Sequence, residues 1–108
     1  KPGTELDHYP FVSNEDQWVT AVVVPVEPME RFALAITSST GKVIVASTSS
    51  NYINFVQFQL PRGAGVWASV KSINYSLSSR GTYRLIVVGS GASGIRTTDI
   101  RGPHQTLY

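Results

Sequence analysis

This chain of 108 residues contains no cysteine. The absence excludes a disulfide framework, a zinc finger and a thiol nucleophile. Charged side chains are also scarce: they make up 15% of the residues, where average domains have about a quarter. No apolar run approaches the length of about 18 residues that a membrane-spanning helix needs, so we expect no membrane insertion. The chain opens on Lys1 rather than Met, from which we expect a fragment of a longer protein.

Serine, threonine, glycine and valine take the place of the missing charges. β-branched and alternating apolar residues recur between turn-forming residues, and no amphipathic helical stripe interrupts them. The pattern predicts strands near residues 17–24, 32–36, 43–47, 53–60, 66–70, 82–89 and 95–100. The length fits one domain. We therefore expect an all-β fold, an antiparallel β-sandwich of six to eight strands, immunoglobulin-like or jelly-roll in type.

Turn residues divide the chain into three segments. Residues 1–14 contain two prolines and predict a hinge or an extended arm. Residues 15–100 predict the β-sandwich domain. Residues 101–108 predict a C-terminal tail.

Three further details follow from the residue types. Ser38-Ser39-Thr40-Gly41 predicts the turn of a hairpin, in which Gly41 supplies a positive φ and the hydroxyls bond locally at the strand ends. In residues 53–60 the apolar residues switch from odd-numbered to even-numbered positions, which predicts a β-bulge near Phe55-Val56. Trp18 lies on the same face of its predicted strand as two of the valines, so we expect Trp18 in the core.

Residues able to catalyse a reaction are few. His8 and His104 lie in the terminal segments, and serine is so common that a triad drawn with either histidine carries little information. Nucleotide-binding and nucleophile-elbow motifs are missing. We expect no enzyme and no cofactor, with calcium as the one exception. Asn14, Glu15 and Asp16 offer the oxygen ligands that Ca²⁺ binds at loops, although a solvated turn explains them as well.

Trp67 is the residue for which we expect a contact role. In the predicted strand, Trp67 lies on the face opposite to Val66 and Val70 and on the same face as Ser69 and Lys71. An exposed tryptophan beside polar side chains suits a sugar ring or a protein partner. The alternative is that Trp67 packs in the core or under a loop.

Four further residues are expected to contribute to association: Tyr52, Tyr75, Arg62 and Arg84. The basic residues are dispersed over separate strands and lack the interleaved aromatic motif of RNA-binding domains. We therefore expect no nucleic-acid binding.

Three segments resemble the pre-peptidase C-terminal domains of secreted bacterial proteases: TGKVIVAS at 40–47, LPRGAGVWASVKS at 60–72 and GTYRLIVV at 81–88. The resemblance implies a secreted, extracellular accessory module that binds a polymer or a protein. RFALAITSS at 31–39 replaces the acidic residues that such domains usually carry, so the calcium sites of that family do not carry over.

The two ends of the chain, KPGTELDHYP at 1–10 and RTTDIRGPHQTLY at 96–108, frame a sandwich rich in Ser, Thr, Val and Gly. This arrangement resembles the protruding domain of small RNA virus capsids, such as those of nodaviruses and tombusviruses. The resemblance implies a virion-surface domain that dimerises and meets a host-cell surface protein or glycan. We therefore expect a non-catalytic association domain that forms a homodimer by pairing sheet faces around Trp67, with the secreted accessory module as the alternative.

Overall fold

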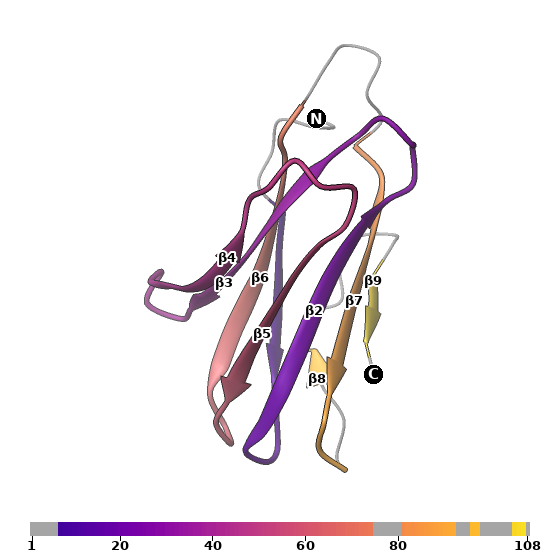
Figure 1. Cartoon of the computed structure of the whole chain (residues 1–108). Helices are drawn as coiled ribbons and strands as arrows, with labels where there is room; N and C mark the ends of the chain where they lie inside the picture. Colours follow the sequence, from indigo (N-terminus) through magenta and orange to yellow (C-terminus); the bar gives the residue numbers. More distant parts are fainter. Residues whose placement is uncertain (1–6, 75–80, 93–95, 98–104, 108) are drawn as a thin grey trace.

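The computed structural model describes residues 7–74, 81–92, 96–97 and 105–107, which form two β-sheets packed face to face (Figure 1). One sheet has the strand order β4-β3-β6-β1-β8 and the other β5-β2-β7-β9. The strands are β1 Asp7–Val12, β2 Gln17–Pro25, β3 Phe32–Ser38, β4 Val43–Ser47, β5 Asn54–Leu60, β6 Gly65–Ser72, β7 Tyr83–Gly89, β8 Arg96–Thr97 and β9 Gln105–Leu107. The prediction of an all-β sandwich is confirmed.

Most connections between strands cross from one sheet to the other. Among the described strands, β3 and β4 are the one consecutive pair that shares a sheet. All strand pairs are antiparallel except β7 and β9, which run parallel. The order differs from that of a constant-type immunoglobulin domain, in which the first, second, fifth and fourth strands share one sheet. Residues that meet on one face of a sheet therefore come from distant parts of the chain.

The core lies between the sheets and is built from alternate residues of each strand. Leu34 and Ile36 of β3 belong to the same core cluster as Leu85 and Val87 of β7, and all four side chains are fully buried. On β2 the hydrophobic core residues are Val19, Ala21 and Val23. The alternation directs the intervening residues of these strands toward the outer faces of the sheets.

A hydrogen-bonded chain of three side chains joins the two sheets across the core. The hydroxyl of Tyr83, on β7, donates to Oδ2 of Asp7, on β1, at 2.6 Å. The hydroxyl of Tyr9, also on β1, bonds to that of Tyr83. Both tyrosines are only 5% exposed. Burial raises the pKa of both hydroxyls above the ordinary value, and for Tyr83 the hydrogen bonds to Asp7 and Tyr9 raise it further.

Asn54 anchors the loop between β4 and β5 with a fully used side chain. Its Nδ2 donates to the carbonyl oxygens of Phe32 and Ser49 at 2.7 and 2.9 Å. Its Oδ1 accepts from the hydroxyls of Ser47 and Ser49 at 2.6 and 2.8 Å. Burial of this amide costs little folding free energy, because each of its polar atoms has a hydrogen-bond partner.

The hairpin of β3 and β4 forms at the predicted turn and extends away from the rest of the sandwich (Figure 1). Gly41 has a φ of 90°, and its N–H donates to the carbonyl of Ser38 at 2.9 Å. The Ser38 hydroxyl bonds to that of Thr40 at 2.8 Å and accepts from the N–H of Lys42 at 3.2 Å. The prediction that the hydroxyls bond locally around a positive φ at Gly41 is confirmed.

The structure differs from the predicted layout in three details. Residues 7–12 of the expected arm form β1, which pairs with β6 over its whole length. No bulge occurs at Phe55-Val56, because β5 pairs with β2 without interruption from Asn54 to Leu60. The register shift lies instead between Ile36 and Thr37, opposite β4. The expected tail contains β9, which adds a parallel strand beside β7.

Candidate association surface

The outer face of the β5-β2-β7 sheet, which we call the β2 face, is largely apolar. Its members alternate with the core residues of the three strands: Phe55, Gln57 and Gln59 on β5; Trp18, Thr20, Val22 and Val24 on β2; Arg84, Ile86 and Val88 on β7. Arg84 is the one charged residue among them. A sheet face that serves only to meet water normally alternates apolar residues inside with polar residues outside.

Cross-strand pairing places three apolar side chains of the β2 face in one continuous row. Val22 is paired with Phe55 on one side and with Ile86 on the other. In the adjacent row, Thr20 lies between Gln57 and Val88, and Nε2 of Gln57 donates to the Thr20 hydroxyl at 3.1 Å. Phe55 is 58% exposed and Val88 is 42% exposed. Covering these two rows would remove apolar area from water, which stabilises a complex by about 25 cal/mol per Å².

The predicted Trp67 patch lies on the opposite side of the sandwich, on the outer face of β6. Trp67 is 40% exposed, and its ring centroid lies 5.3 Å from that of His8 on β1. Nδ1 of His8 is 2.8 Å from the hydroxyl oxygen of Ser69, which is buried. Lys71 is exposed. Trp67 and Lys71 can therefore meet a partner directly, whereas His8 covers Ser69.

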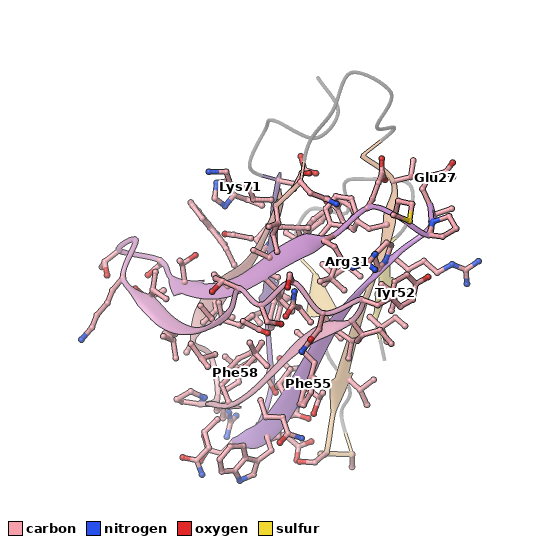
Figure 2. The ribbon with its side chains drawn as sticks, turned by 45° about the horizontal axis from the view of Figure 1, so that its top comes forward. Glu27, Arg31, Tyr52, Phe55, Phe58 and Lys71 are labelled. Atoms are coloured by element: carbon pink, nitrogen blue, oxygen red, sulfur yellow. The ribbon has the colours of Figure 1, made fainter. Side chains whose placement is uncertain are left out.

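The other predicted contact residues are spread over different parts of the surface. The Tyr52 hydroxyl donates to the Pro25 carbonyl at 3.1 Å, and the guanidinium carbon of Arg31 lies 5.1 Å from the Tyr52 ring centroid (Figure 2). In the same view Lys71 lies well apart from Tyr52, so the two do not share a patch.

Two predicted arginines also lie apart from Trp67. Arg62 is in the turn between β5 and β6, and Arg84 belongs to the β2 face. Tyr75 lies outside the described residues. The structure thus brings Trp67, Ser69 and Lys71 together on one strand and separates them from Tyr52, Arg62 and Arg84.

The prediction that Trp18 lies in the core is wrong, because Trp18 is 55% exposed on the β2 face. Both parities of β2 are apolar, so alternation alone could not tell which set points inward. Phe55, a further exposed aromatic residue of this face, was missed for a related reason. A sequence signal was present all the same: a strand that is apolar on both faces is typical of one whose outer face is covered.

The predicted calcium ligands have separate surroundings. Oδ1 of Asp16 accepts the N–H of Arg62 at 2.7 Å, and the N–H of Glu15 donates to the Ser13 hydroxyl at 3.2 Å. Asn14 is exposed. Within the described ranges there is no cluster of three or more His, Cys, Asp or Glu that could hold a metal ion. The calcium site stays a prediction from the sequence.

Comparisons with family models, with curated proteins and with solved structures find no match for this chain. In the part of the chain that the structure describes, no helix is long and apolar enough to cross a membrane. We therefore infer the function from the two sheet faces and from the residues at their ends.

Proposed function

We propose that this chain is a non-catalytic association domain that pairs with a second copy of itself through the β2 face. The observation that carries the proposal is the uncharged row of Phe55, Val22 and Ile86 across three regular strands. In a two-fold symmetric pair the same patch occurs on both subunits, so the apolar row of one copy meets that of the other. Two sheets pack in this way at a separation of about 10 Å.

The size of the β2 face indicates a weak pair. Three strands spaced about 4.8 Å apart, each contributing about seven residues at about 3.4 Å, cover roughly 340 Å². Stable protein interfaces bury about 800 Å² per partner. We therefore expect a dimer that dissociates on dilution and that becomes firm where many copies are tethered in one assembly, because tethering raises the effective concentration.

The more specific form of the proposal is the surface domain of a viral capsid protein, which dimerises and attaches the virion to a host-cell protein or glycan. Its support is the β-sandwich fold together with a composition rich in Ser, Thr, Val and Gly, which resembles that of capsid protruding domains. The alternative form is an accessory module of a secreted bacterial hydrolase. That form needs no pairing, and a monomeric domain would favour it.

The proposal is tested by a matched pair of substitutions on opposite sheets. Val88→Lys places a charge on the β2 face, whereas Val43→Lys places the same charge on β4 of the other sheet; the two valines are 42% and 55% exposed. Sedimentation equilibrium should show that Val88→Lys weakens pairing at least about tenfold, since a two-fold axis brings two such charges together. Val43→Lys should pair as the unchanged protein does.

Equal effects of the two substitutions would contradict the assignment to the β2 face. Circular dichroism of both variants provides the control for folding. Loss of pairing in Val43→Lys alone would move the interface to the sheet that carries Trp67.

A further inference from the structure

A cleft of about 360 Å³ lies at one end of the β2 face and is lined by Asp16, Gln17, Trp18, Gln59, Leu60 and Pro61. It forms where β2 begins and β5 ends, at the lower end of the molecule in Figure 1. Strand pairing fixes its walls, because Gln17 is paired with Leu60 and Trp18 with Gln59. The position of each side chain is therefore set by a regular sheet rather than by a loop.

Gln17 and Leu60 form the buried side of the cleft. Leu60 belongs to the core and is 1% exposed. Gln17 is 7% exposed, its Nε2 donates to the Ser13 hydroxyl at 2.5 Å, and its Oε1 accepts the N–H of Gly91 at 2.8 Å. A site whose base is held in this way requires little rearrangement when a ligand binds.

The polar groups at the rim have hydrogen-bonding capacity left for a ligand. Asp16 is oriented by the Arg62 N–H, which donates to Oδ1 at 2.7 Å, and Oδ2 makes no hydrogen bond within the described residues. The side-chain amide of the exposed Gln59 likewise makes none there. A carboxylate accepts and an amide both donates and accepts, which is the mixture that vicinal hydroxyl groups require.

Trp18 supplies the apolar part of the cleft. Its side chain is 55% exposed, and within the described residues its indole ring makes no contact with another aromatic ring. An indole offers a broad apolar face together with one N–H donor. The C–H face of a pyranose ring is apolar while its edge carries hydroxyls, so a sugar can lie on Trp18 and bond to Asp16 and Gln59 at the same time.

We propose that this cleft binds a neutral pyranose. A volume of about 360 Å³ is at the lower end of the range for small-ligand sites, about 300–1,000 Å³, which fits one or two sugar rings. The Asp16 carboxylate disfavours an acidic sugar. A quaternary ammonium ligand is the less suitable occupant, because such ligands are held by several aromatic rings and the cleft has one. The inference rests on the attachment part of the proposed function and does not require pairing.

The test uses the two tryptophans of the chain, Trp18 and Trp67. In Trp67→Phe, Trp18 is the sole tryptophan and reports on the cleft by its fluorescence. In Trp18→Phe, Trp67 remains on the opposite sheet and serves as the matched control. Each variant is titrated with galactose, glucose, mannose and N-acetylglucosamine, as free sugars and as methyl glycosides. Choline and N-acetylneuraminic acid are added as comparison ligands.

We expect a saturable change in Trp67→Phe with a Kd on the order of 1–10 mM for at least one neutral sugar. In Trp18→Phe we expect no saturable change. Asp16→Asn, which keeps an oxygen for the Arg62 N–H, should weaken binding about tenfold in the Trp67→Phe background. Binding of the methyl glycoside would identify the terminal residue of a glycan as the ligand, and binding of the reducing sugar alone would identify a free sugar.

Three outcomes would overturn the inference: no saturable change with any neutral sugar, equal changes in the two tryptophan variants, or tighter binding of choline or the acidic sugar. Sedimentation of the same Trp67→Phe protein reports pairing independently. A failure of sugar binding is thereby distinguished from a failure of the proposed dimer.

Discussion

Tyr83→Phe tests whether β1 is held in the sandwich by the chain of Asp7, Tyr9 and Tyr83. The substitution keeps the ring, which packs against Tyr9 at 6.3 Å and Phe32 at 4.9 Å between centroids, and removes only the hydroxyl. Asp7 then loses the 2.6 Å bond from Tyr83, and the buried Tyr9 hydroxyl loses its partner.

The expected cost of Tyr83→Phe can be worked from these contacts. A hydrogen bond to a charged group contributes about 1.5–3 kcal/mol, and a buried hydroxyl left without a partner costs about 1–3 kcal/mol. Since Tyr9 and Asp7 can partly relax toward water, we expect a loss of about 2–3 kcal/mol in the free energy of unfolding. For a domain of this size that lowers Tm by roughly 8–12 °C.

The assay is urea unfolding followed by circular dichroism, with Tyr9→Phe as the control. Tyr9→Phe leaves the bond from Tyr83 to Asp7 in place, so we expect it to cost only about 1 kcal/mol. The double variant should cost less than the sum of the two, because the two hydroxyls are partners. A loss below about 0.5 kcal/mol for Tyr83→Phe, the range of a neutral surface change, would contradict the docking of β1 through this contact.

Three further predictions concern pH, packing and calcium. The pKa values of Tyr9 and Tyr83 are raised in the folded state. The stabilisation that their neutral hydroxyls contribute is therefore complete below about pH 10, the ordinary pKa of tyrosine. Above that pH the free energy of unfolding falls by about 1.4 kcal/mol per pH unit for each tyrosine. Unfolding measured over a range of pH should show this fall in the unchanged protein but not in the double variant with Phe at both positions. Leu34→Ala, at a fully buried position, should cost about 2–5 kcal/mol in thermal unfolding, and a cost below about 1 kcal/mol would contradict the core as described. Millimolar Ca²⁺ should leave Tm unchanged, because the described residues contain no group of three or more His, Cys, Asp or Glu that could hold a metal ion; a rise in Tm with calcium concentration would instead confirm the sequence-based site.

Much of the fold could be predicted from the sequence because its signals are local. The turn at Gly41 depends on one residue that tolerates a positive φ, and β3 alternates apolar residues with small ones. β1 was missed because Pro10 makes a strand look improbable. In the structure Pro10 is paired with Trp67 on one side, while β8 reaches only Phe11 and Val12 on the other, so a proline is tolerated there.

The candidate surfaces could not be predicted in the same way, because they depend on which face of each strand points inward. Alternation in β2 identifies two apolar sets, and only the pairing with β5 and β7 decides that Trp18 and Val22 lie outside. The contact between His8 and Ser69 joins residues 61 positions apart, so no local pattern indicates that Ser69 is covered. Long-range register, which the sequence does not state, therefore decides which side chains a partner can reach.

Whether the domain pairs with a second copy is decided by its molar mass in solution. Light scattering over a wide range of protein concentrations should give 11.7 kDa at high dilution. The mass should rise smoothly toward twice that value as the concentration approaches about a millimolar, which corresponds to a weak association. A mass that stays at that of the single chain at every concentration would contradict the proposed pairing.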